Sequence, residues 1–100
     1  ALKTIRESNG TATATLEEEV VQGIQLLAEM EGIFTETAGG VVISGLRRLA
    51  ERNIIKSDEL TVAYITGNGL KTQEAVSHVV NPVLTKPNLE AFEEALHARA

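Results

Sequence analysis

Apolar residues recur at helical spacing in three stretches of this chain. The stretches are residues 15–31, residues 41–52 and the segment that begins at residue 88. In the first, Val20, Ile24 and Leu27 stand at positions i, i+4 and i+7, and Gly32 supplies a C-terminal stop. Thr15 and Glu18 have the spacing of a capping box at its start. Weaker helical patterns cover residues 1–10 and 72–80, so helices are expected along most of the chain.

Three other stretches have the β-branched composition or the alternation of strands. They are residues 11–15, 33–36 and 60–66, and the last is almost wholly apolar or β-branched. Strands that alternate with helices favour right-handed βαβ crossovers. The sequence therefore predicts an α/β fold of three-layer βαβ units with a small, mostly parallel sheet. Residues 1–80 are expected to form this βαβαβ part, and residues 81–100 a loop and a C-terminal helix.

Composition and charge narrow the range of functions. The chain has 100 residues, carries a net charge of −5 and contains no cysteine. An acidic chain is a poor ligand for nucleic acid or anionic lipid, and no apolar run approaches the 18 residues of a membrane span. The absence of cysteine excludes disulfides and thiolate chemistry and fits a reducing compartment, so a cytoplasmic location is expected. His78 and His97 have no ligand partners at metal spacing, so no metal site is expected. The chain begins without Met and in a helical pattern, which suggests a piece of a longer protein.

Two polar segments follow predicted strands, where open α/β sheets bind ligands. Glu36 precedes Thr37-Ala38-Gly39-Gly40, and Thr66 precedes Gly67-Asn68-Gly69. A rigid strand would hold the Thr66 hydroxyl, and Gly67 permits positive φ and close approach of a ligand. The same residues could equally be a helix start and a glycine turn, since neither a Walker A nor a GxGxxG pattern is present. Lys71, after the second segment, is expected to be a surface lysine.

Taken together, residues 31–41 and 62–71, joined by a helix, resemble the carboxyl-terminal part of the threonine synthase family. The resemblance covers roughly residues 1–80. It implies the large domain of a fold-type II pyridoxal-phosphate enzyme, the fold type of the tryptophan synthase β subunit. It also implies a lyase of threonine biosynthesis, which converts O-phospho-L-homoserine and water to L-threonine and phosphate.

The resemblance further implies roles for individual residues. Thr66 would face the ring nitrogen of pyridoxal phosphate, and Glu36, Ala38 and Gly67 would lie near the cofactor. The Schiff-base lysine, the phosphate-binding loop and most of the substrate site would lie upstream, so no catalytic residue is assigned to this chain. Alone, the chain is expected to be inactive and to bind no cofactor covalently. Its expected partners are the remainder of the enzyme chain, a small-molecule substrate and further copies in a homo-oligomer, with no nucleic acid and no membrane.

Two alternatives stay open. The first is part of a threonine or serine dehydratase of the same fold type, which the run Thr66-Gly67-Asn68-Gly69-Leu70-Lys71 disfavours. The second is a non-catalytic α/β module with a regulatory or assembly role. An upstream Ser-x-Lys cofactor segment would favour the enzymes, and an open reading frame that ends just before Ala1 would favour the module.

Overall fold

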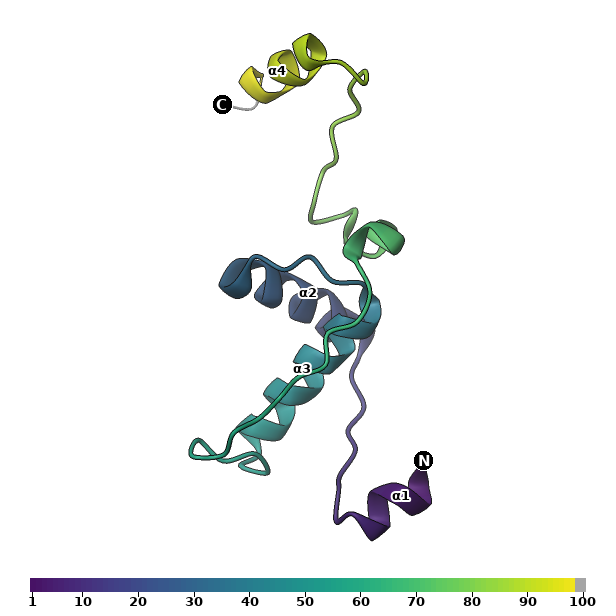
Figure 1. Cartoon of the computed structure of the whole chain (residues 1–100), viewed down its shortest axis with the longest axis vertical. Coiled ribbons are helices and arrows are strands. Elements are labelled where there is room, and N and C mark those ends of the chain that lie inside the picture. The colour runs from purple at the N-terminus through teal and green to yellow at the C-terminus, as the bar shows by residue number, and fades with distance from the viewer. Residues whose placement is uncertain (99–100) are drawn as a thin grey trace.

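A computed structural model describes residues 1–98 of the chain, and Figure 1 shows its elements. They are α1 (Leu2–Glu7), α2 (Glu17–Glu31), α3 (Thr37–Glu51), the 3₁₀ turns η1 (Gly69–Lys71) and η2 (Gln73–Val76), and α4 (Leu89–His97). Helices α2 and α3 pack on each other, and α1 and α4 stand at opposite ends of the molecule. The radius of gyration is 17.7 Å, whereas a compact chain of this length has about 13 Å. The molecule is therefore elongated around one pair of helices.

The predicted fold class is wrong, because the structure has no β-sheet within residues 1–98. Residues 11–15, 33–36 and 60–66 lack regular structure instead of forming strands. Segments 11–15 and 60–66 both border a hollow on α3, and no backbone hydrogen bond joins them. A strand needs a neighbour within about 4.8 Å in the hydrogen-bonding direction. The βαβ prediction failed because the segments with high β propensity lie against a helix and have no second strand beside them.

Other predicted elements are confirmed or shifted. Helix α2 ends at Gly32, which adopts φ 68°, as predicted. Asn88 caps α4, where its Oδ1 accepts a hydrogen bond from the backbone N–H of Ala91 at 2.8 Å. The helix predicted over residues 72–80 is instead the turn η2 and irregular chain. The division of the chain at residue 80 stays a prediction.

The start of α2 differs from prediction by one residue. The N-cap is Leu16 rather than Thr15, and its backbone N–H donates to Glu19 Oε2 at 2.6 Å, so Glu19 takes the place predicted for Glu18. This backbone hydrogen bond lowers the pKa of Glu19, and the guanidinium of Arg48 on α3 adds to the effect. Glu19 thus links the first turn of α2 to the neighbouring helix.

Two glycines allow α2 and α3 to cross closely. A Cβ on Gly40 would lie 2.5 Å from the carbonyl oxygen of Val20, and a Cβ on Gly23 would overlap the carbonyl oxygen of Gly40. Beside this crossing the hydroxyl of Ser44 donates to the carbonyl oxygen of Glu19. The crossing fixes where α3 begins relative to α2, and so positions the residues at the start of α3.

The substitution Gly40→Ala should separate the two helices. The new methyl group would meet backbone oxygen, which cannot move alone, so overpacking should outweigh the gain of about 1 kcal/mol in helix propensity. We expect the free energy of unfolding, measured by urea denaturation, to fall by roughly 2 kcal/mol. Gly45→Ala is the matched control, because its Cβ would lie 3.3 Å from Thr13 Cγ2, the end of a side chain. If Gly40→Ala and Gly45→Ala lowered the free energy of unfolding equally, the close approach of α2 and α3 at Gly40 would be contradicted.

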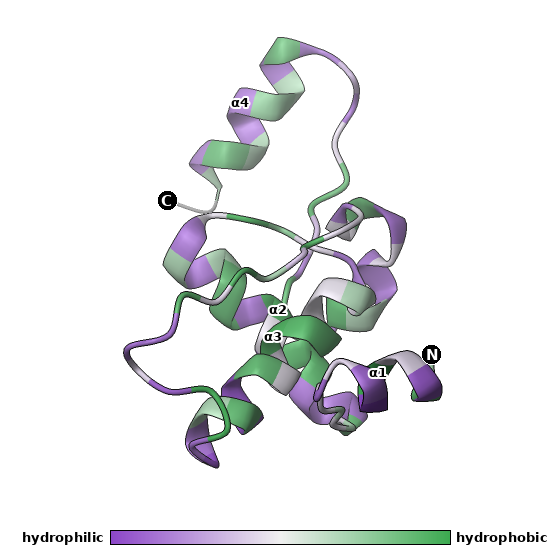
Figure 2. Cartoon of the chain, turned by 60° about the horizontal axis from the view of Figure 1, so that its bottom comes forward, coloured by the Kyte–Doolittle hydropathy of each residue, from purple (hydrophilic) through white to green (hydrophobic). Residues whose placement is uncertain are grey.

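Much of the apolar surface is uncovered. The accessible surface is 8040 Å², against about 5,500 Å² for a compact protein of this mass. Helix α4 buries no residue, and Leu89, Phe92 and Leu96 on it are 53–70% exposed. Figure 2 shows the hydrophobic positions along α4 and the other helices. Among the helices of the described chain, none is both long and apolar enough to cross a membrane.

Candidate functional site

Glu36 stands at the start of α3 as its N-cap residue. Its backbone is extended, and its carbonyl oxygen accepts hydrogen bonds from the N–H groups of Gly39 at 3.0 Å and Gly40 at 3.2 Å. The side chain makes no capping hydrogen bond and is 12% exposed. The backbone of Glu36 therefore begins the helix, while its carboxylate is directed elsewhere.

The turn at residues 66–72 folds onto the segment that precedes α3. The N–H of Gly69 donates to the carbonyl oxygen of Phe34 at 3.0 Å, and the N–H of Thr37 donates to Thr72 Oγ1 at 3.2 Å. A Cβ on Gly69 would lie 2.5 Å from the Phe34 ring, so the glycine lets the turn approach the aromatic face. Two hydrogen bonds and one close contact thus join segments that are more than thirty residues apart.

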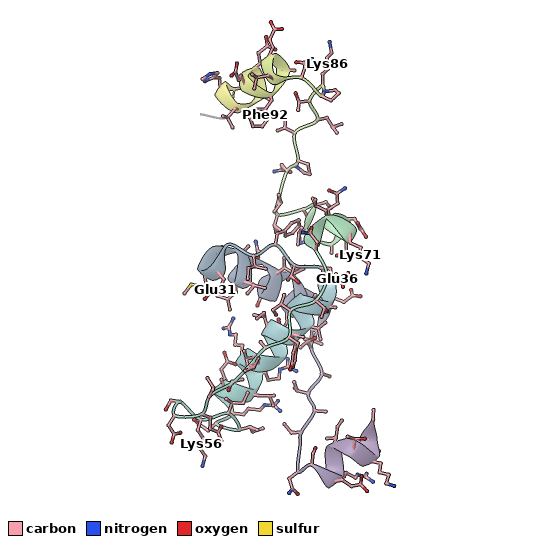
Figure 3. All side chains as sticks on the ribbon, in the orientation of Figure 1. Glu31, Glu36, Lys56, Lys71, Lys86 and Phe92 are labelled. Carbon is pink, nitrogen blue, oxygen red and sulfur yellow. The ribbon has the colours of Figure 1, made fainter. Side chains whose placement is uncertain are left out.

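The Glu36 carboxylate lies at the centre of this junction. Lys71 Nζ is 3.0 Å from Glu36 Oε2, and Figure 3 shows the two side chains where the turn meets α3. Gly67 has φ 75°, and a Cβ there would overlap Cδ and Oε1 of Glu36. The carboxylate is held between an ammonium group and the backbone of a glycine that no other residue could replace without strain.

The structure brings two of the four predicted site residues, Glu36 and Gly67, into contact. Thr66, the residue before Gly67, is exposed to solvent. Ala38 is exposed in the first turn of α3. Lys71 is 71% exposed, as expected of a surface lysine, but it also pairs with Glu36. The roles of Thr66, Glu36, Ala38 and Gly67 toward a cofactor stay predictions.

Sequence reasoning missed the residues that clamp the turn. Phe34 supplies an acceptor and a ring face, and Thr72 supplies an acceptor for Thr37. The sequence carries one partial signal, because Glu36 in the first polar segment and Lys71 just after the second have opposite charges.

A hollow of about 490 Å³ opens beside the junction. It is lined by Glu17, Glu18, Val20, Val21, Thr37, Val41, Ala75 and His78. Thr37 connects the junction with the hollow, because its N–H donates a hydrogen bond to the turn and Thr37 also lines the hollow. Glu36, Gly67, Thr66 and Ala38 are not among the residues that line the hollow. The groups nearby are the Glu36 carboxylate against Gly67 and the exposed residues Thr66 and Ala38. Such groups can accept hydrogen bonds from a ligand and allow a flat ring to approach the backbone.

Three curated proteins show what the chain is similar to. The threonine synthase of Methanosarcina acetivorans is 38% identical over 101 residues, which cover 100% of this chain and 25% of that protein. The threonine synthase of Methanocaldococcus jannaschii is 47% identical over 75 residues, 75% of this chain and 18% of that protein. The threonine synthase of Halalkalibacterium halodurans is 38% identical over 94 residues, 92% of this chain and 27% of that protein. The chain matches one part of the sequence of these threonine synthases. The resemblance inferred from the two polar motifs is thereby confirmed.

The match to this family is partial in length. The chain spans about a quarter of the threonine synthases from M. acetivorans and H. halodurans and less of the one from M. jannaschii. No family model matches the chain. Since the match to the M. acetivorans threonine synthase covers 100% of this chain, it includes both Glu36 and the turn at residues 66–72.

Proposed function

We propose that this chain is a carboxyl-terminal segment of a threonine synthase that uses pyridoxal phosphate. The complete enzyme would be a lyase that converts O-phospho-L-homoserine and water to L-threonine and phosphate. The observation that carries this proposal is the contact between Glu36 and Gly67, which unites the two motifs of the family resemblance. The family match along the whole chain supports the same conclusion.

The residues at the junction suit a cofactor with a flat aromatic ring. Pyridoxal phosphate, when bound, supplies an electron sink for the reaction. The exposed hydroxyl of Thr66 would face the ring nitrogen, and a neutral hydroxyl does not hold a proton on that nitrogen as a carboxylate would. Glu36 and Gly67 would lie along the ring, and Ala38, exposed and small, leaves space beside it.

The remaining parts of the site would come from the rest of the enzyme chain. These parts are the lysine that binds the cofactor covalently, the phosphate-binding loop and most of the contacts to the small-molecule substrate. We therefore expect the isolated chain to be catalytically inactive and to bind no cofactor covalently. A biosynthetic enzyme of this kind would act in the cytoplasm.

A chimeric enzyme tests the proposal. The segment of the M. acetivorans threonine synthase that matches this chain is replaced by residues 1–100, and phosphate release from O-phospho-L-homoserine is measured. We expect the chimera to form threonine with pyridoxal phosphate bound, whereas the isolated chain releases no phosphate. A chimera that folds and binds pyridoxal phosphate but forms no threonine would contradict the proposed function.

We further propose that the chain self-associates. Leu89, Phe92 and Leu96 form an exposed apolar face on α4, and burial of such a face is favourable. In sedimentation velocity at high concentration we expect species heavier than the 10.7 kDa chain. Phe92→Asp should shift the distribution toward monomer, and Lys3→Gln serves as the control on the exposed α1. A wild-type chain that stays monomeric would contradict the expectation.

A further inference from the structure

We propose that Lys71 is a positioning residue, which fixes the Glu36 carboxylate and balances its charge in the candidate cofactor site. The inference rests on the proposed function for the meaning of the site, and on the geometry of the junction for the role of Lys71. It assigns to this lysine a task that neither the family resemblance nor the sequence pattern indicated.

The Glu36 carboxylate is largely buried, and the Lys71 ammonium group lies beside it. The Glu36 side chain is 12% exposed, so most of its hydration is lost, and burial of an unpaired charge is unfavourable. Lys71 Nζ lies 3.0 Å from Oε2, and the backbone of Gly67 lies against Oε1. The two contacts hold the carboxylate from two sides and so restrict its rotation.

The backbone delivers Lys71 to this position. Lys71 ends η1, where its N–H donates to the carbonyl oxygen of Asn68 at 3.0 Å and the N–H of Thr72 donates to Gly69 at 3.1 Å. Thr72 in turn accepts the N–H of Thr37. The residue after the lysine is therefore bonded to the residue after Glu36, and the two side chains face each other across this link.

This ion pair differs from the others in the described part of the chain. The pairs Lys3–Glu7 and Arg47–Glu51 each lie within a single helix, α1 and α3 respectively. The pair Arg48–Glu19 joins α3 to α2. Lys71–Glu36 joins the two motifs of the candidate site. Since the lysine side chain is 71% exposed, the pair should contribute little to global stability. Its effect is expected on the site rather than on the fold.

The experiment compares Lys71→Met and Lys71→Arg in the chimeric enzyme. If Lys71 orients Glu36, Lys71→Met should lower kcat by about tenfold or more, with the KM for O-phospho-L-homoserine nearly unchanged. Lys71→Arg, which keeps the charge, should restore most of kcat. Lys86→Met is the matched control, because Lys86 lies in the loop before α4, away from Glu36, and should leave kcat unchanged.

A raised KM with kcat retained would assign Lys71 to substrate phosphate and overturn the proposal, as would unchanged kinetics. A second measurement on the 100-residue chain does not depend on activity. Nuclear Overhauser contacts between the Glu36 side chain and the Gly67 Hα atoms should weaken in Lys71→Met and persist in Lys71→Arg. Contacts that persist unchanged in Lys71→Met would overturn the proposal. If the unmodified chimera folds and binds pyridoxal phosphate but forms no threonine, the proposed function fails, and the contacts in the 100-residue chain still decide the role of Lys71.

Discussion

Gly67→Ala is expected to detach the turn at residues 66–72 from Glu36. The substitution has two costs, because φ at this position is 75° and because the new Cβ would overlap the Glu36 carboxyl group. A left-handed backbone costs a residue with a side chain about 1–2 kcal/mol. The Glu36 carboxyl group is the end of a side chain and can shift, so the overlap adds the lower end of the usual overpacking cost, about 1 kcal/mol. We expect the free energy of unfolding, measured in urea, to fall by about 2–3 kcal/mol, and protection of the Gly69 amide against hydrogen exchange to be lost.

Gly32→Ala separates the two costs. Gly32 has φ 68°, close to that of Gly67, but a Cβ there would meet nothing within 4 Å. This variant should lose only the backbone component, about 1–2 kcal/mol. In a Glu36→Ala background, the loss of unfolding free energy caused by Gly67→Ala should fall to that of Gly32→Ala. If Gly67→Ala and Gly32→Ala were equally destabilising in the wild-type background, the contact between Gly67 and Glu36 would be refuted.

Thr66→Val is expected to have the largest effect on catalysis in the chimeric enzyme. Valine keeps the shape of threonine but removes the hydroxyl, so the ring nitrogen of the cofactor would lose its partner, at about 1–3 kcal/mol. This corresponds to a fall in kcat of roughly fivefold to 150-fold. Because Thr66 is exposed in the chain, the free energy of unfolding should change by less than about 0.5 kcal/mol.

Thr61→Val is the control for Thr66→Val. Thr61 is also exposed and lies in the same extended segment, five residues before Thr66. It should leave both kcat and stability unchanged. An unaltered kcat in Thr66→Val would remove Thr66 from the site.

The helices were the part of the fold that local sequence could predict. Their signals are short-range: Gly32 ends α2 in the left-handed conformation, and Asn88 caps α4 through its own side chain. The segment at residues 60–66 shows the limit of such signals. Its alternation appears in the structure, where Ala63 and Ile65 are half-buried between exposed neighbours. No local feature of the sequence indicates whether a second strand lies beside this segment. Within residues 1–98 no such strand is present.

The candidate site was predicted through an argument that was only partly correct. The expectation that both polar segments border a ligand site came from the strand ends of a parallel sheet, and the sheet is absent from the described residues. Glu36 and Gly67 are nevertheless in contact. They meet because Gly69 is bonded to Phe34 and Thr72 to Thr37. The Lys71–Glu36 pair depends on how a 3₁₀ turn orients a side chain toward a distant helix, which the sequence alone does not specify.

The two motifs, about thirty residues apart, meet at the Glu36 carboxylate. The most direct test is a nuclear Overhauser spectrum of the 100-residue chain, with contacts between Ile24 and Gly40 as the internal reference for the α2–α3 crossing. We expect contacts from the Glu36 side chain to Gly67 Hα and from the Phe34 ring to Gly69 Hα. If the reference contacts are present and both of these are absent, the two motifs do not meet in solution.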